Sequence, residues 1–565
     1  MNVDRGKKSL RIDPIVSQGI LPLPLMQSIT FCNHSVDHSG MTTGLYFLYY
    51  NGKYNANKCN QLHTKLNLID KSYNMSNNTP TITPSSSQDP SSSQDPTAPN
   101  DRLSFAQLIA IPALERKDHA MQIWLFSGVF WMLVAASIGL IEAIKLFYPE
   151  FLQSVPALAY GRLRPVHVNV GLFGFMSMGY LGAAFYMVPR LTQSNLYSET
   201  LGVLTAWGWN INLLGGLLGI LMGFSKGKEY EELPFPFDMM IGILEILIAG
   251  NLFSTITIRK EPRLYVSLWY ILLAIIPFPI YYTLGNMMNF RGIEDAIVNW
   301  FYSHNLFGLW LTTLGLATLY YIVPKQLNKP LFSHAISFLG FWTLAAFYPW
   351  NGGHHVIWGP VPGWVMTASV TASIAMLIPT FATMVNFGGT AWGEWGLLKR
   401  DIGFRFSMLA YLSYVGTSLW GSSLAIMDLN AKLHFTSTTI AHVHLGFVGF
   451  GLAGLAAFIY FYLERSLKRE YSKPLAEWHF WLTVLGTIGY VVSMGTLGWL
   501  EGTQWEAGNS VQGVMGMRYW YNVARAGSGS LLLIAQVLFA WNIWRTVTRP
   551  DNLITVEALE AEVFH

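Results

Sequence analysis

Charged residues are scarce in this chain of 565 residues, because lysine, arginine, aspartate and glutamate together make up only 12% of it. Soluble globular domains carry about 25% of these residues, so the deficit excludes an ordinary soluble protein. Hydrophobic residues reach 52% and aromatic residues 15%, which is typical of a membrane protein with aromatic side chains at the lipid–water boundary. The net charge of +3 is too small to indicate a nucleic acid as partner.

Cysteine is nearly absent from the chain. The two cysteines, Cys32 and Cys59, precede the first long apolar segment, so the apolar segments offer no thiolate as a metal ligand. The pair is compatible with a disulfide and equally with two free thiols. The sequence Cys-x-x-Cys-His, which attaches heme covalently, does not occur.

Residues 1–118 differ from the rest of the chain. They contain asparagine-rich stretches and a direct repeat, SSSQDP at 85–90 and again at 91–96. This composition cannot bury a core and predicts a disordered or poorly structured extension. No signal-peptide pattern is evident in it. We expect residues 119–550 to form one membrane domain and residues 551–565 to form a cytoplasmic tail.

Twelve apolar stretches follow, each close to the ~20 residues that a bilayer requires. They lie at 120–147, 162–188, 200–224, 237–257, 264–286, 297–323, 332–352, 364–388, 403–427, 435–463, 478–499 and 526–547. The predicted fold is therefore all-α, a polytopic bundle of about twelve transmembrane helices. Lysine and arginine are more frequent on the side of the N-terminal flank, which predicts a multi-pass protein of the inner (cytoplasmic) membrane with both termini in the cytoplasm.

Six of the 14 histidines lie within these stretches or at their ends: His167, His304, His354, His355, His442 and His444. On this topology all six fall in the outer half of the membrane. A histidine inside a bilayer is costly and needs a partner, so this set indicates bound metal.

The spacing of the histidines separates them into groups. His442 and His444 are two residues apart and therefore point about 200° apart on a helix, so one helix is expected to serve two different metals. The adjacent His354 and His355 are expected to converge on one copper ion, for which nitrogen ligands are suited. His304 is at a similar depth and is the expected third ligand.

Several motifs around these histidines resemble one family. GRLRPVHVNVGLF, NWFYSHNLFGLW, FYPWNGGHH, IAHVHLGFVGFG and YNVARAGSG are similar to the central subunit of the heme-copper oxidase superfamily, and most similar to the C-family, the cbb3-type cytochrome c oxidases. The resemblance covers about 119–550. It implies twelve helices around two hemes, expected to be b-type, and one copper ion.

The resemblance also implies roles for individual residues. His167 and His444 would be the axial pair of a low-spin heme, and His442 would hold a high-spin heme. His304, His354 and His355 would bind the copper that faces it. Basic side chains expected at the heme propionates are Arg162, Arg164 and Arg525.

Tyr348 precedes His354 by six residues. In C-family oxidases a tyrosine at this place is linked covalently to the copper histidine of the sixth helix, here His304, and supplies an electron and a proton to oxygen. The A-family carries its tyrosine, and nitric oxide reductases carry a glutamate, four residues after that histidine. Gly308 occupies this position, which disfavours both.

The expected function is therefore that of the catalytic subunit of a terminal respiratory oxidase, a cytochrome c oxidase that reduces O₂ to water. A nitric oxide reductase of the same superfamily is the alternative, and a non-enzymatic heme carrier is a third. Trp420 departs from the C-family pattern, which usually has a glutamate near this position. Electrons are expected from c-type cytochrome subunits. Protons from the cytoplasm are expected to pass Ser337 and Tyr414, with proton pumping as a further expectation.

Overall fold

The structure is a computed structural model that describes residues 117–549. Most of the predicted N-terminal extension, with Cys32 and Cys59, lies outside the described residues, as does the predicted C-terminal tail. The described part is built from helices, whose bounds are as follows.

The first half contains α3 (His119–Lys145), η2 (Pro156–Leu158), α4 (Tyr160–Asn169), η3 (Val170–Ser177), α5 (Met178–Thr192), α6 (Glu199–Met222), α7 (Phe237–Thr257), α8 (Val266–Ile275), α9 (Phe278–Asn286), α10 (Ile293–Asn305), η4 (Leu306–Thr312) and α11 (Thr313–Gln326). The second half contains α12 (His334–Phe347), η5 (Tyr348–His355), α13 (Gly363–Ala375), α14 (Leu377–Ala391), η6 (Trp395–Lys399), α15 (Ile402–Leu424), α16 (Met427–Leu433), α17 (Ser437–His444), η7 (Leu445–Leu452), α18 (Ala453–Phe461), η8 (Tyr462–Ser466), α19 (Lys473–Glu506), η9 (Gln512–Val514) and α20 (Met515–Thr548).

Each of the twelve predicted stretches is helical, and ten of the resulting helices are long and apolar enough to cross a membrane. The exceptions are α12 and α15. The α-helical part of α12 has only 14 residues before the chain tightens into the 3₁₀ turns of η5. The helix α15 has 23 residues, but the charged Arg405 and the many serine, threonine and tyrosine residues of this helix lower its mean hydropathy.

The last two helices are longer than predicted. The structure extends the stretch at 478–499 to α19 and the stretch at 526–547 to α20, each of 34 residues. At 1.5 Å per residue each helix is about 51 Å long, whereas the hydrocarbon core of a bilayer is about 30 Å thick. Apolar length alone therefore underestimates helices that continue beyond the lipid.

Three of the spans contain a π-helical stretch in their middle. These stretches are η3 between α4 and α5, η4 between α10 and α11, and η7 between α17 and α18. Such wide turns are rare in α-helices and are frequently found at functional sites. Each of the three begins within three residues after one of the predicted ligand histidines, namely His167, His304 and His444.

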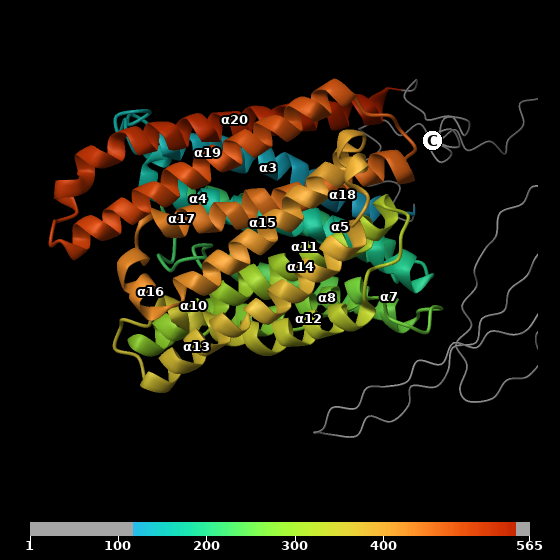
Figure 1. Ribbon diagram of the computed structural model, residues 1–565, viewed down its shortest axis with the longest axis horizontal. Helices are drawn as coiled ribbons and strands as arrows, with labels where there is room; N and C mark the ends of the chain where they lie inside the picture. The colour runs from blue at the N-terminus through green and yellow to red at the C-terminus, as the bar shows by residue number, and fades with distance from the viewer. Residues whose placement is uncertain (1–116, 550–565) are drawn as a thin grey trace, which may run out of the picture. The chain divides into compact units, whose positions relative to one another are not determined.

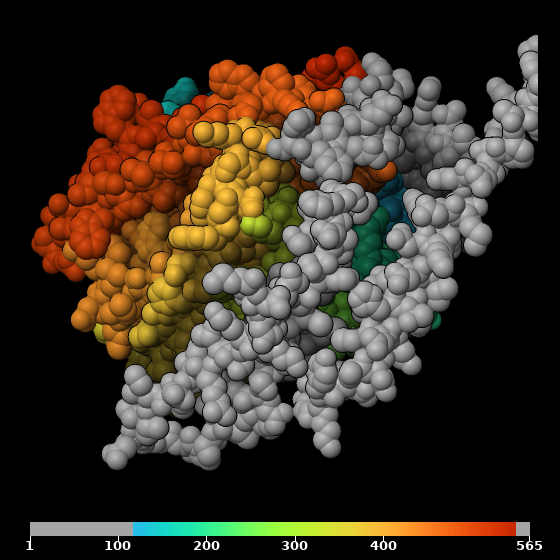
Figure 2. All heavy atoms as spheres, turned by 45° about the vertical axis from the view of Figure 1, so that its right-hand side comes forward, coloured from blue at the N-terminus to red at the C-terminus, as the bar shows by residue number. Residues whose placement is uncertain are grey.

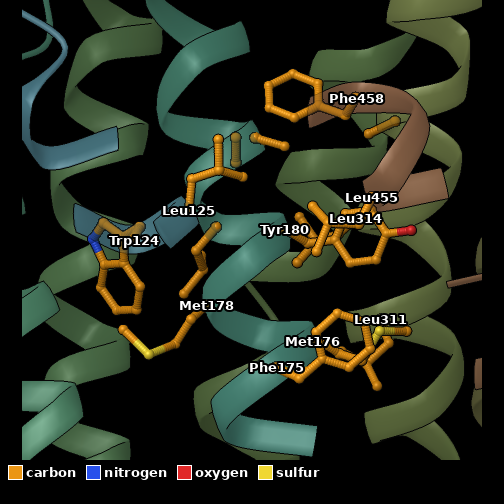
Figure 3. Packing of buried hydrophobic residues seen from close by; sticks show 14 of the residues in the cluster. Trp124, Leu125, Phe175, Met176, Met178, Tyr180, Leu311, Leu314, Leu455 and Phe458 are labelled. Carbon is orange, nitrogen blue, oxygen red and sulfur yellow. The ribbon is translucent and has the colours of Figure 1, made fainter. Parts of the chain in front are cut away.

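The helices run alongside one another with their long axes roughly aligned (Figure 1). Figure 3 shows Tyr180 of α5 next to Leu455 of α18, with Leu125 of α3 further to the left. Close approach depends on small residues, since a Cβ atom at Gly128 of α3 would lie 2.6 Å from the backbone nitrogen of Gly179. Membrane helices commonly pack through small residues, because lipid provides no hydrophobic drive for association.

The outer helices expose apolar side chains. On α19, Leu485, Ile488 and Val492 are each more than half exposed, and Trp478 and Trp499 are exposed towards its two ends. In the space-filling view the side chains of α19 and α20 form a continuous outer surface (Figure 2). A lipid-facing surface with tryptophans near its boundaries accounts for this pattern.

Candidate functional site

His167 and His444 face each other across a small cavity. His167 lies on α4 and His444 ends α17, and their ring centres are 6.4 Å apart with ring planes 12° apart. Two metal–nitrogen bonds of about 2 Å each fit within this separation once the distance from each nitrogen to its ring centre is added. The pair therefore fits a metal held between two imidazoles.

The protonation of both rings is fixed by the backbone. His167 Nδ1 lies 3.0 Å from the carbonyl oxygen of Ala135, and His444 Nδ1 lies 2.9 Å from that of Ile440. Because a carbonyl oxygen only accepts, each Nδ1 donates a proton, and each Nε2 is left with a lone pair. A hydrogen bond of this kind orients a metal-binding imidazole and raises its basicity.

The cavity around this pair has a volume of about 190 Å³. Its walls are mostly apolar, and the polar side chains among them include the carboxyl of Glu142 from α3, the phenol of Tyr490 from α19 and the guanidinium of Arg525 from α20. The ring of Tyr490 stacks on His444, with centres 4.3 Å apart and planes 24° apart. The largely apolar walls and the facing imidazoles fit a heme.

His442 faces a second and larger cavity of about 400 Å³. This cavity is also lined by His304, His354 and His355, whereas His444 lines only the smaller one. The structure thus places the two histidines of α17 on different cavities, as their spacing predicts. The Nδ1 atom of His442 is buried without a hydrogen-bond partner among the described residues.

His304, His354 and His355 converge in a way that suits one metal ion. Their ligand atoms all lie within 4.8 Å of one another, and the Nε2 atoms of His354 and His355 are 3.1 Å apart. His354 Nδ1 lies 2.9 Å from the hydroxyl of Ser373, which fixes its ring. Three imidazole nitrogens are a donor set that copper prefers, so these residues fit the predicted copper.

Tyr348 packs against His304. The two ring centres are 4.8 Å apart with planes tilted by 31°. The ring of Tyr348 also fills the space beside Gly308, since a Cβ atom on Gly308 would lie 1.7 Å from Tyr348 Cζ. A tyrosine or glutamate at position 308 is therefore incompatible with the observed place of Tyr348.

Replacing Gly308 by alanine is expected to push Tyr348 out of position. The added methyl group overlaps the ring, and overpacking of this kind costs about 1–3 kcal/mol. We expect a lower melting temperature of the purified protein and a loss of oxygen consumption. The matched control is Gly250→Ala on α7, where nothing lies within 4 Å of the new Cβ atom. Wild-type melting and oxygen consumption in Gly308→Ala would contradict the packing of Tyr348 described here.

The three arginines that were predicted to lie at heme propionates differ in their position relative to the two cavities. Arg525 lines the smaller cavity and Arg164 lines the larger one. Arg162 lines neither, because its guanidinium donates to the carbonyl oxygen of Leu221 at 2.8 Å. Arg162 and Arg164 are two residues apart on one helix, so they point in nearly opposite directions.

The loop at 223–236 closes over the site with acidic residues. Glu229 accepts a hydrogen bond from Arg164 at 2.5 Å, and Glu232 accepts one from Asn169 at 3.0 Å. Burial raises the pKa of the Glu232 carboxyl above its ordinary value, and the hydrogen bond from Asn169 acts in the opposite direction. These contacts attach the loop to α4, the helix that carries His167.

The two residues predicted for proton entry also differ in their surroundings. Tyr414 lines the larger cavity, and its buried hydroxyl has no partner among the described residues. Ser337 is buried on α12 and lines neither cavity; its hydroxyl donates to the carbonyl oxygen of His334 at 2.7 Å.

Two residues of the larger cavity were not anticipated. Trp300 stacks on His355 with ring centres 3.9 Å apart, and His434 lies 6.0 Å from His355. Trp300 precedes His304 by one helical turn, which is a usable signal, whereas His434 lies in a loop and gives none. Four residues, Tyr230, Phe307, Val443 and Phe447, line both cavities and form the wall between them.

Comparison with known proteins identifies the family. Residues 119–549 match the family described as Cytochrome C and Quinol oxidase polypeptide I. The chain is 31% identical to the Cbb3-type cytochrome c oxidase subunit CcoN1 of Stutzerimonas stutzeri, over 74% of this chain and 92% of that protein. It is 30% identical to cytochrome c oxidase subunit 1 of Rhodobacter capsulatus, over 79% and 88% of the two chains.

A solved structure shares the fold. It is described as a cryo-EM structure of a heme-copper terminal oxidase dimer, and it matches with a TM-score of 0.61 at 15% identity over 76% of this chain and 84% of that chain. The fold, the converging histidines and the matched residues agree. The chain belongs to the family of the catalytic subunit I of heme-copper cytochrome c and quinol oxidases.

Proposed function

We propose that this chain is the catalytic subunit of a C-family, cbb3-type terminal oxidase, which reduces O₂ to water with electrons from c-type cytochrome subunits. The observation that carries the proposal is the packing of Tyr348 against His304 in the space left by Gly308. The similarity to a Cbb3-type subunit supports the type. The same place in a nitric oxide reductase of this superfamily would hold a glutamate, for which there is no room.

The cofactors that we assign are two b-type hemes and one copper ion. His167 and His444 would hold the low-spin heme, His442 the high-spin heme, and His304, His354 and His355 the copper. When bound, the high-spin heme and copper supply electrons to O₂. Arg164 and Arg525 would neutralise propionates, while Arg162 is not used, because it lines neither cavity.

The protein groups supply geometry and protons for this reaction. Reduction of one O₂ to two waters consumes four electrons and four protons, and cleavage of the O–O bond requires both at the same place. The Tyr348 phenol lines the larger cavity beside His304 and can give one proton and one electron there. The hydrogen bond between His354 and Ser373 keeps that imidazole in place as charges change.

Protons would enter from the cytoplasmic side, where we place both termini of this inner-membrane protein. Tyr414 and Thr417 of α15 line the larger cavity, and both hydroxyls are buried without partners among the described residues. Buried polar groups of this kind are normally satisfied by ordered water. A proton route past Ser337 and Tyr414 to Tyr348 would therefore be lined by ordered water molecules. We also propose that oxygen reduction is coupled to proton pumping.

The proposal is tested with the purified complex and a reduced c-type cytochrome. We expect consumption of O₂ with four electrons taken from the donor for each O₂. Nitric oxide offered under the same conditions should be consumed far more slowly. Rapid nitric oxide reduction without O₂ consumption would instead identify a reductase, and heme without bound copper or turnover would identify a heme carrier.

The assignment of the low-spin heme predicts the effect of His444→Ala. The ring of His444 is held by Ile440 and stacked by Tyr490, and its loss leaves one axial nitrogen. We expect the low-spin spectrum to disappear while the copper content, which depends on other residues, stays normal. An unchanged low-spin spectrum would show that His444 is not an axial ligand.

A further inference from the structure

Glu142 is a buried carboxyl that the proposed reaction does not use. It lies on α3, is only 3% exposed, and lines the smaller cavity together with His167 and His444. Its Oε1 atom has no hydrogen-bond partner among the described residues. A carboxylate buried in a mostly apolar wall is unfavourable unless it is paired, so its charge depends strongly on its surroundings.

The charged and titratable groups that face Glu142 come from several helices. Arg525 of α20 acts most strongly on it and Arg164 of α4 acts second. Tyr160 at the start of α4 and Tyr490 of α19 belong to the same electrostatic cluster. Glu142 and Arg525 are the two carboxyl and guanidinium groups in the described lining of this cavity, with the phenols of Tyr230 and Tyr490 beside them.

Other charges near Glu142 are directed elsewhere. Lys145, one turn further along α3, donates to the carbonyl oxygen of Phe151. Arg164 is paired with Glu229 at 2.5 Å. The Nε atom of Arg525, by contrast, has no hydrogen-bond partner among the described residues. A buried acid and a half-buried base, whose Nε atom is itself buried, therefore share one small cavity in which neither is fully satisfied.

We propose that Glu142 is a redox-linked proton-binding group, whose carboxyl takes up a proton when the metal centre held by His167 and His444 is reduced and releases it on oxidation. The electron comes from the donor cytochrome and the proton from water, so the charge of the cavity stays the same. The proposal rests on the proposed function, since that pair must hold a heme.

The sign of the effect follows from electrostatics. Reduction removes one positive charge from the metal, and in a site of low dielectric constant this makes the carboxylate less favourable relative to the neutral acid. The reduced protein then binds more protons than the oxidised protein. By linkage, the midpoint potential of the low-spin heme must fall as pH rises through the range in which Glu142 titrates.

The experiment is a spectroelectrochemical titration of the low-spin heme in the purified complex across the neutral pH range. In the wild type we expect the equilibrium constant between oxidised and reduced heme to change by up to tenfold per pH unit. This corresponds to a shift of the midpoint potential of about 59 mV per pH unit for one electron. Glu142→Gln keeps the size of the side chain and removes the titration, so the potential should rise at alkaline pH and the slope should flatten. Glu150→Gln, which removes an exposed carboxylate just after α3, should keep the wild-type slope.

Infrared difference spectra between the reduced and oxidised states give a second measurement. The wild type should show a protonated carboxyl band on reduction, which Glu142→Gln should lack. If the glutamine variant fails to assemble, Glu142→Asp is used instead, because it retains a carboxyl. In this variant the midpoint potential should still fall with rising pH, but over a pH range displaced from that of the wild type.

The possible results distinguish a failure of the inference about Glu142 from a failure of the proposed heme ligands. A normal low-spin heme with the same slope and the same infrared band in the wild type and Glu142→Gln would overturn this inference alone. The same holds for a slope in Glu142→Asp that is not displaced. A wild-type protein without a six-coordinate heme spectrum would overturn the assignment of His167 and His444, and the inference with it.

Discussion

Replacing Tyr348 by phenylalanine is expected to stop oxygen consumption while both hemes and the copper stay bound. Four-electron cleavage of O₂ needs an electron beyond those that iron and copper readily give, and the phenol beside His304 supplies it with its proton. Phenylalanine keeps the ring that packs beside Gly308, so the protein should fold normally. Losses attributed to general acid–base groups are typically 10²–10⁴-fold, and we expect a loss of at least about this size.

The control for this variant is Tyr180→Phe. Tyr180 is fully buried, whereas Tyr348 is partly buried. The Tyr180 hydroxyl donates to the carbonyl oxygen of Gly451 at 2.7 Å, and the residue lines neither cavity. It should lose some stability and keep oxygen consumption. Mass spectrometry of the native protein should also find a peptide with Tyr348 cross-linked to one with His304. Unlinked peptides together with normal turnover in Tyr348→Phe would contradict the oxidase proposal.

Replacing His354 or His355 by alanine is expected to abolish oxygen consumption through loss of copper. Each variant removes one of three converging nitrogens and leaves the other two without a complete donor set. The hemes should stay bound, because their proposed ligands belong to α4 and α17. Elemental analysis measures the copper directly and optical spectra measure the hemes.

The matched control for the copper variants is His334→Ala. His334 is exposed at the start of α12 and lines neither cavity; its ring lies edge-on to that of Tyr265, with ring centres 6.2 Å apart. It should keep a full copper content. A normal copper content in His354→Ala or in His355→Ala would remove that residue from the proposed ligand set.

The grouping of the six histidines could be predicted because it depends on spacing along helices. His442 and His444 must point apart on any α-helix, and their cavities are indeed different. The same reasoning applied to Arg162 and Arg164 would have shown that both cannot face one heme. In both cases the spacing of the two residues on one helix decides in which directions their side chains point.

Other features of the site leave little trace in the sequence. Glu142 is a single acidic residue in an apolar stretch, and nothing local tells whether it faces lipid, another helix or a cavity. His434 depends on the path of the loop between α16 and α17. The full lengths of α19 and α20 were missed because the residues beyond the lipid are polar yet still helical. In each case the position follows from packing between distant segments.

The three π-helical turns in the middle of the spans have a consequence for the insertions and deletions that this chain can tolerate. Each turn η3, η4 and η7 holds more residues than the α-helical repeat, so the helix beyond it is rotated relative to a regular continuation. Deleting one residue there, for example Gly446, would turn everything that follows by about 100° relative to His444. An insertion or deletion in these turns would move the proposed metal ligands and the rest of the bundle out of phase.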